Sequence, residues 1–286
     1  MCSVYQTAPP QVTDPSFPPS LLVRPLGVIP YIELPVLHVP IWGRPVDIFG
    51  LLSAAGTFLG AWLAADQAKK WRPGDDKPLR DVVTWAVVGG LVGGHFLHVF
   101  AYHPELLAQE GWTVVLRVWD GLSSMGGVLG ALAGIFAFFR KNKIKLMPYV
   151  DALALGTAPG WALARVGCFL VHDHPGVHTD FFLAVRYPDG PRHDLGLYDF
   201  FVLLALTGLL WFLKKKNPPT GTLMGLLALI YSVCRFSLDF LRASDLSFVD
   251  RRYFGLTPAQ YVVVGLAAVG VKLLMGARQE ALTPSK

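Results

Sequence analysis

Seven apolar runs, each of roughly 18–23 residues, recur along this 286-residue chain. A helix needs about 20 consecutive apolar residues to cross a bilayer, so each run is long enough to span one. The runs are hydrophobic all round and rich in glycine and alanine, which is typical of transmembrane helices that pack against one another. They lie near residues 46–66, 81–102, 121–139, 149–171, 196–213, 221–241 and 257–276. The sequence therefore predicts an all-α, polytopic membrane protein with seven transmembrane helices.

The composition agrees with a membrane protein. Charged residues make up 16% of the chain, well below the ~25% that is usual in soluble domains. The first residues are polar and proline-rich, and they lack the basic segment and the cleavage site of a signal peptide. We therefore expect a flexible N-terminal tail at 1–28, a seven-helix transmembrane domain at 29–276 and a cytoplasmic tail at 277–286.

Basic residues follow every odd-numbered run and predict the orientation. They are Lys69, Lys70, Arg72, Lys77 and Arg80 after the first run, Arg140, Lys141, Lys143 and Lys145 after the third, Lys214–Lys216 after the fifth, and Arg278 and Lys286 after the seventh. Positively charged loops stay in the cytoplasm, so the N-terminus is predicted outside and the C-terminus inside. Because the positive charge lies in short loops between apolar runs, no nucleic-acid partner is expected.

Two arginines, Arg165 and Arg235, lie inside apolar runs. A guanidinium at membrane depth costs at least ~2.5–3.5 kcal/mol on insertion scales, so it is retained for a partner or a function. Its planar, two-pronged geometry suits phosphate, which predicts a site for an anionic lipid headgroup in the outer half of the membrane. The alternative is that Arg165 extends outward to the polar residues that end its run. Asp239, one turn after Arg235, is expected to pair with it, and Arg242 extends the same face.

Histidines near the outer ends of these runs are candidates for proton transfer. His172, Asp173 and His174 end the fourth run, and His193 precedes the fifth. An unperturbed histidine titrates near pH 6.5 and can serve as a general base, although His193 is also compatible with a plain loop residue. Two histidines and a carboxylate in one loop are a weak metal pattern. We therefore predict no metal and no other cofactor.

Three segments resemble one known family, the bacterial prolipoprotein diacylglyceryl transferases. Arg165 to Gly176 resembles its signature segment without a gap. Arg192-His193 followed by Leu197-Tyr198-Asp199 is similar to its Arg-His-Pro-Ser-Gln-Leu-Tyr-Glu stretch. Tyr231 to Arg242 resembles a third motif, with Arg235, Asp239 and Arg242 in register. The resemblance covers about residues 28–276.

The resemblance implies an enzyme of the bacterial inner membrane whose site opens to the periplasm. Such enzymes move a diacylglyceryl group from phosphatidylglycerol to the lipobox cysteine of prolipoproteins, and glycerol phosphate leaves. The catalytic residues implied or proposed are Arg165, Arg235, His172, His174 and His193. Those expected to bind substrate are Gly126, Gly127, Gly167, Asp173, Gly176, Tyr198, Asp239 and Arg242.

One departure from the family bears on the chemistry. Met125 stands where the family has the histidine usually assigned as the base. Since a thioether cannot abstract a proton, His172, His174 or His193 is predicted to replace it. Two alternatives stay open: a related transferase that acts on another acceptor or lipid, and a non-catalytic membrane protein that binds anionic lipid.

Overall fold

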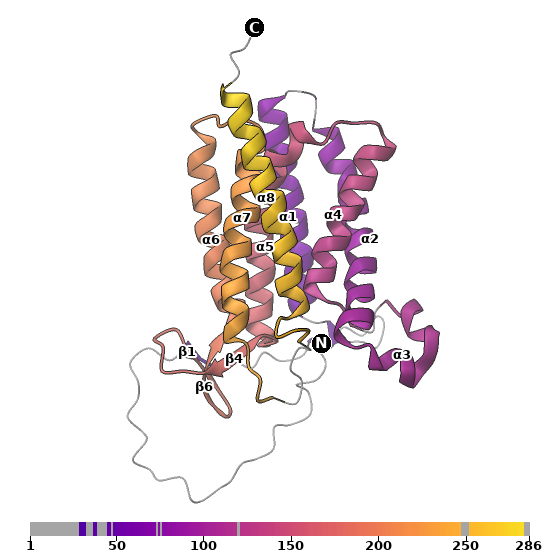
Figure 1. The fold of residues 1–286 in the computed structure, drawn as a ribbon, viewed down its shortest axis with the longest axis vertical. Helices are drawn as coiled ribbons and strands as arrows, with labels where there is room; N and C mark the ends of the chain where they lie inside the picture. Colours follow the sequence, from indigo (N-terminus) through magenta and orange to yellow (C-terminus); the bar gives the residue numbers. More distant parts are fainter. Residues whose placement is uncertain are drawn as a thin grey trace, which may run out of the picture.

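The computed structural model describes residues 29–32, 37–38, 45–46, 48–72, 74, 76–118, 121–246 and 252–282. The long helices are α1 (Ile48–Trp71), α2 (Lys77–Leu97), α4 (Ser124–Lys141), α5 (Val150–Val171), α6 (Leu195–Lys214), α7 (Thr222–Leu238) and α8 (Pro258–Leu282). They stand side by side as a bundle (Figure 1). The tail predicted at 1–28 and the last four residues lie outside the described part of the chain.

Each predicted apolar run forms a helix, but not all of these helices have the same capacity to cross a membrane. Within the described residues, six are long and apolar enough to do so: α1, α2, α5, α6, α7 and α8. Helix α4 is not among them, because its 18 residues include four glycines and end in Arg140-Lys141. The mostly helical membrane architecture is therefore confirmed, with six candidate spans where seven were predicted.

Short helical segments extend or join these helices. They are the π-helix η3 (His98–Tyr102), the helix α3 (Glu105–Glu110) and the 3₁₀ helices η4 (Gly111–Leu116), η5 (Met147–Tyr149) and η6 (Asp239–Leu241). Figure 1 places α3 at the same end of the bundle as the strands. Since η3 and η6 directly continue α2 and α7, both helices are lengthened at that end.

The prediction of an all-α fold is wrong at one end of the bundle, where a small sheet forms (Figure 1). Its strand order is β1-β5-β6-β4, with β1 (Ile29–Pro30) parallel to β5 (Val185–Tyr187) and antiparallel pairs between β5 and β6 (Gly190–Asp194) and between β6 and β4 (Pro175–His178). Pro188 and Asp189 join β5 to β6, and Gly190, the first residue of β6, has a φ of +127°. A second pair, β2 (Leu37–His38) with β3 (Pro45–Val46), is antiparallel. These strands are too short for a clear alternation in the sequence.

Glycines bring pairs of helices into close contact, as the sequence predicted. Helix α1 packs along α5, and α2 packs along α4. A Cβ built on Gly56 would lie 2.2 Å from the carbonyl oxygen of Gly160, and one on Gly93 would lie 2.6 Å from the oxygen of Gly126. Any larger side chain would push these backbones apart, so the glycines set the spacing of the bundle.

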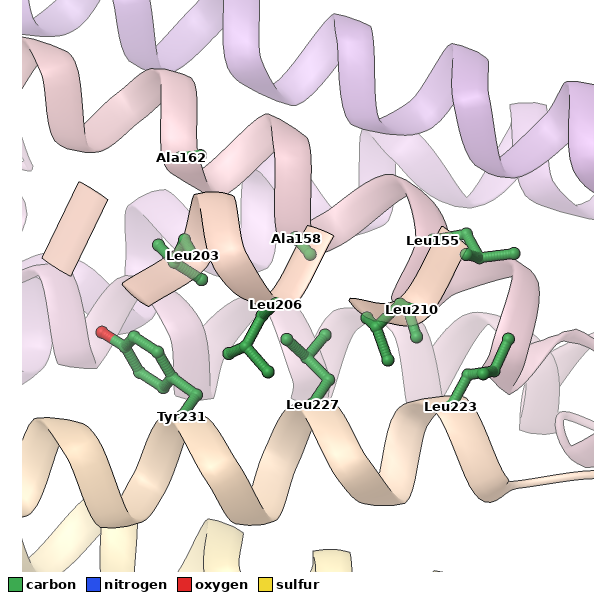
Figure 2. Close-up of a cluster of buried hydrophobic side chains, with 10 residues drawn as sticks. Leu155, Ala158, Ala162, Leu203, Leu206, Leu210, Leu223, Leu227 and Tyr231 are labelled. Atoms are coloured by element: carbon green, nitrogen blue, oxygen red, sulfur yellow. The ribbon is translucent and has the colours of Figure 1, made fainter. Parts of the chain in front are cut away.

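An apolar core fills the space between α5, α6 and α7 (Figure 2). Leu155 and Ala158 of α5 meet Leu206 of α6 and Leu227 of α7, all of them buried. Tyr231 is the last residue of this core towards the sheet end, and its hydroxyl group points beyond it (Figure 2). The polar cluster described next begins at that hydroxyl.

Candidate active site

The structure brings the two predicted arginines together. Arg165 near the end of α5 and Arg235 near the end of α7 are only 1% and 2% exposed. One terminal nitrogen of each lies 3.2 Å from Oδ2 of Asp199, which is fully buried near the start of α6. Three helices thus contribute to one ionic centre inside the bundle.

This centre is part of a chain of alternating charges. Arg235 also lies 3.1 Å from Oδ1 of Asp239, and the same oxygen accepts a 3.2 Å hydrogen bond from Nε of Arg242. The hydroxyl of Thr257, just before α8, donates to the other oxygen of Asp239. Three guanidinium groups thus alternate with two carboxylates along this chain.

Both buried arginines keep donors that no side chain uses. Within the described residues, Nε of Arg165 and Nε of Arg235 are buried and have no hydrogen-bond partner. Nη2 of Arg165 also donates to the hydroxyl of Tyr231 at 3.3 Å, and its guanidinium lies 5.8 Å from the centre of the Trp161 ring. Unsatisfied buried donors are costly, so this arrangement favours a ligand that accepts from them.

A compact group of ligating side chains adjoins Arg165. Nη1 of Arg165 lies 3.5 Å from Sγ of Cys168 and 3.3 Å from Nε2 of His174. Nδ1 of His174 lies 2.9 Å from Oδ1 of Asp173. Burial opposes ionisation of Asp173, but the neighbouring His174, Arg165 and Arg242 outweigh it and hold the pKa of this carboxyl below its ordinary value. Of the predicted histidines, His174 is the one beside the arginines.

His172 is in a different environment. It ends α5 in the left-handed conformation, with a φ of +49°, and it is 1% exposed. Its Nδ1 lies 3.1 Å from Asp194, the residue that caps α6, and Tyr31 stacks on its ring at 4.0 Å. The backbone nitrogen of Ile32 donates to its other ring nitrogen. These contacts tie the end of α5 to the start of α6 and to β1.

His193 and Tyr198 lie together at an apolar pocket. Nδ1 of His193 is 2.7 Å from the hydroxyl of Tyr198. The pocket has a volume of about 480 Å³ and is lined by Phe181, Leu183, His193, Tyr198, Phe201, Leu238 and Leu241. Burial lowers the pKa of His193 below its ordinary value. The lining suits an aliphatic chain better than a headgroup.

Arg192, the neighbour of His193 in the motif, connects the sheet to the segment after α7. It binds Asp245 through two hydrogen bonds of 2.6 and 3.1 Å, and its Nε and Nη2 also donate to Asp189. A further bond goes to the carbonyl oxygen of Gly176. Burial would lower the pKa of Arg192, but the hydrogen bonds and charges of Asp245 and Asp189 outweigh it and raise this pKa above its ordinary value. Arg192 therefore has a structural role beside the pocket.

The predicted glycines lie at close contacts between elements. Gly126 faces Gly93 of α2. Gly127 lies at the same interface, where a Cβ built on it would be 3.8 Å from the carbonyl oxygen of Gly90. Gly167 packs against α1, and Gly176 fits between His193 and Leu241. Met125 is buried with Ala259 and Val263 of α8, and Trp161 and Phe236 pack against this group. A methionine thus fills apolar space beside the residues that neighbour both arginines.

Reasoning from sequence missed four residues of this centre: Asp199, Tyr231, Cys168 and Thr257. Asp199 and Tyr231 were quoted only for their resemblance to family motifs. The rule that identified the arginines, a charge inside an apolar run, also applies to Asp199. Tyr231 lies one helical turn before Arg235 and so shares its face. For Cys168 and Thr257 the sequence offered no clear signal, because each joins this centre only through a tertiary contact, Cys168 with Arg165 and Thr257 with Asp239.

Comparisons with known proteins identify the family. A model of the family described as prolipoprotein diacylglyceryl transferase matches residues 37–276. The chain is 29% identical over 249 residues to the phosphatidylglycerol–prolipoprotein diacylglyceryl transferase of Nitratidesulfovibrio vulgaris strain Miyazaki F, covering 85% of this chain and 92% of that protein. Proteins of the same description from Chromohalobacter salexigens and Pseudomonas paraeruginosa are also 29% identical, over 88% and 90% of this chain and 96% and 99% of theirs. The chain belongs to the prolipoprotein diacylglyceryl transferase family.

Proposed function

We propose that this protein transfers the diacylglyceryl group of phosphatidylglycerol to the lipobox cysteine of a prolipoprotein. The observation that carries the proposal is the shared contact of Arg165 and Arg235 with Asp199 inside membrane-spanning helices, with unused donors on both arginines. This arrangement supports the binding of a phosphodiester in apolar surroundings. The type of reaction is inferred from the family to which the chain belongs.

The arginines act on the phosphate. Sulfur of the acceptor cysteine forms a bond to the glyceryl carbon while the bond from that carbon to the phosphate oxygen breaks. The oxygen keeps the bonding electrons, and glycerol phosphate leaves with the proton that the thiol has lost. Arg165 and Arg235 stabilise the charge that develops on the leaving phosphate, and Asp199 and Asp239 position them.

The acceptor thiol is activated beside Arg165, where His174 and Asp173 lie. A thiol attacks carbon as a thiolate, and its unperturbed pKa is about 8.5. With Met125 in apolar packing, His174 is the histidine within reach of the arginines. The pocket next to His193 and Tyr198 accommodates an acyl chain or apolar lipobox side chains.

The site faces the periplasm in this proposal. Helix α1 ends with Lys69 and Lys70, α4 with Arg140 and Lys141, and α6 with Lys214. These ends lie at the end of the bundle away from the sheet (Figure 1). The positive-inside rule puts them in the cytoplasm, so the sheet, the arginines and the pocket open to the outer leaflet of a bacterial inner membrane.

A transfer assay tests the function. Purified protein in lipid nanodiscs is given radiolabelled phosphatidylglycerol and a lipobox peptide, with an otherwise identical peptide that has serine in place of cysteine as the control. Labelled thioether on the cysteine peptide alone is the expected result. Tightly bound anionic lipid in the purified protein without turnover would favour the non-catalytic alternative. Turnover without rescue of a strain depleted of its own transferase would favour a different acceptor.

A further inference from the structure

The ring of His174 lies between a cation and a carboxylate. Nη1 of Arg165 is 3.3 Å from its Nε2, and Oδ1 of Asp173 is 2.9 Å from its Nδ1. A guanidinium has only N–H donors and stays protonated in proteins, so Nε2 must turn a lone pair towards Arg165. The single ring proton of a neutral His174 is therefore on Nδ1, on the side of the carboxylate.

In this arrangement His174 is not free to act as a base. A general base takes up a proton on the nitrogen that has the lone pair, and in His174 that nitrogen is Nε2. A neutral imidazole has one acceptor nitrogen, and Nη1 of Arg165 already donates to it. A thiol proton can reach Nε2 only after Arg165 has withdrawn Nη1.

The contacts of Nη1 are the ones that Arg165 gives up most readily. Besides His174, Nη1 lies 3.5 Å from Sγ of Cys168, and sulfur is a weak acceptor. Nη2 contacts the buried carboxylate of Asp199 at 3.2 Å, and Nε has no partner within the described residues. Charge-assisted hydrogen bonds to phosphate are about 2.7–2.9 Å long and roughly twice as strong as neutral ones. A phosphate at Arg165 therefore outcompetes the thiol and the imidazole for Nη1.

Asp173 is suited to hold the ring of His174 while Arg165 moves. Burial would raise the pKa of Asp173, but His174, Arg165 and Arg242 outweigh it and hold this pKa below its ordinary value. The carboxylate is thus ionised, and it keeps the ring proton on Nδ1. It also faces the positive charge that the ring acquires when Nε2 takes up a proton.

We propose that the phosphate of phosphatidylglycerol draws Nη1 of Arg165 away from His174 and so frees Nε2 to deprotonate the acceptor thiol. Asp173 is the positioning residue for this step. The inference rests on the proposed transfer function and deepens it, because the thiol is activated only when the lipid is bound. The thiol proton passes to Nε2, sulfur bonds to the glyceryl carbon, and the carbon–oxygen bond breaks with its electrons on the phosphate oxygen. Nε2 then returns the proton to the departing glycerol phosphate.

Nitrogen NMR of protein labelled with ¹⁵N-histidine tests this release without relying on turnover. Delipidated protein in phosphatidylcholine nanodiscs at about pH 8, where an unperturbed histidine is neutral, is compared before and after addition of phosphatidylglycerol. No peptide is present, so no acceptor can be modified. The signals of His174 are identified by their loss in His174→Gln. Those of His178, an exposed residue near Asp189 and Asp245, are the internal control and should not move.

Two observations are expected from the wild-type protein. Without phosphatidylglycerol, His174 should have a protonated Nδ1 and an unprotonated Nε2 that accepts a hydrogen bond. As phosphatidylglycerol binds, the Nε2 signal should shift towards that of an unbonded imidazole nitrogen, in step with the lipid's own ³¹P signal.

Substitution of Asp173 tests its positioning role. The amide of Asp173→Asn can donate to Nδ1, so part of the ring population should move its proton to Nε2. Transfer should then fall by about 10²–10⁴-fold, the usual contribution of a general base. Asp173→Glu keeps a carboxylate and should restore the Nδ1 proton and part of the rate. Asp180→Asn, at an exposed residue, should change neither.

The outcomes separate the inference from the function. A proton on Nε2 in lipid-free protein, or an Nε2 signal that stays in place while phosphatidylglycerol binds, overturns the inference, and successful transfer to the cysteine peptide would then leave the function intact. The expected shift without transfer to any lipobox peptide would reject the function and keep the release of His174. Failure of phosphatidylglycerol to bind would reject both.

Discussion

Arg165 and Arg235 contact the same oxygen atom, Oδ2 of Asp199, each at 3.2 Å. The three residues come from α5, α7 and α6, so one carboxylate fixes the positions of three helices at the depth of the site. Arg235 has a second carboxylate partner in Asp239, yet Nε of both arginines has no hydrogen-bond partner within the described residues, and we propose that a phosphodiester accepts from these donors.

Replacing Asp199 with asparagine should destabilise the protein. Removing one partner of a buried ion pair costs about 3–5 kcal/mol because the remaining charge loses its compensation. The unfolding free energy, measured by titration with sodium dodecyl sulfate in mixed micelles, should fall by that amount. Asp180→Asn, at an exposed loop residue, is the control. A change of less than about 0.5 kcal/mol for Asp199→Asn would mean that the arginines do not depend on this carboxylate.

Replacing Arg165 with lysine should reduce transfer by about 10²–10³-fold, the usual effect of losing one preorganised donor to a developing negative charge. A lysine keeps the positive charge but cannot offer the planar pair of donors. The measurement is the initial rate of labelled thioether formation in nanodiscs. Arg186→Lys, in the exposed middle of β5, should keep the wild-type rate. Full activity of the Arg165 variant would contradict the proposal that Arg165 binds the phosphate through two donors.

Substitution of His174 should affect the reaction, whereas substitution of His172 should affect stability. His174→Gln is expected to slow transfer strongly with little change in melting temperature, since His174 is half-buried beside Arg165. His172→Gln should instead lower stability by about 1–3 kcal/mol, because the buried Asp194 loses a partner. Paired rate and thermal-unfolding measurements on both variants decide this. The reverse outcome would assign the catalytic role to His172, at the end of α5 beside β1.

Met125 should act through packing alone. Met125→Leu keeps the volume and apolar character of this buried position, so the transfer rate should stay within about twofold and stability within about 1.5 kcal/mol. Met125→Ala leaves a cavity and should cost about 2–5 kcal/mol. A large loss of rate in the leucine variant with unchanged unfolding would assign the thioether a role in the reaction.

The Arg192 contacts predict a loss of stability in acid. Hydrogen bonds from Arg192 lower the pKa of Asp245 to about 2, whereas an unfolded aspartate titrates near pH 3.9. A depressed folded-state pKa contributes stability above the unfolded value, and this is lost as pH falls from about 4 towards 2. Asp245→Asn should therefore melt earlier than wild type at pH 7, and the difference should shrink below pH 4. A constant difference across this range would contradict the assignment.

The sequence by itself determined the helices, because a membrane span needs a length of apolar residues that can be read directly from the chain. It also identified Arg165, Arg235 and Asp239, since a charge inside such a run is rare and calls for a reason. The abundance of glycine and alanine in these runs also predicted close packing between helices, although the pairing of α2 with α4 comes from the tertiary structure.

Tertiary structure decided which polar groups meet. Asp199, 34 residues after Arg165 and 36 before Arg235, joins them only because α6 packs beside α5 and α7. His172 and His174, two positions apart, were equal candidates in the sequence, yet a single left-handed residue at the end of α5 directs one towards Asp194 and the other towards Arg165. Cys168 is an ordinary small residue until that turn brings a carboxylate and an imidazole to it. Such contacts depend on the path of the chain in three dimensions, and linear spacing does not encode that path.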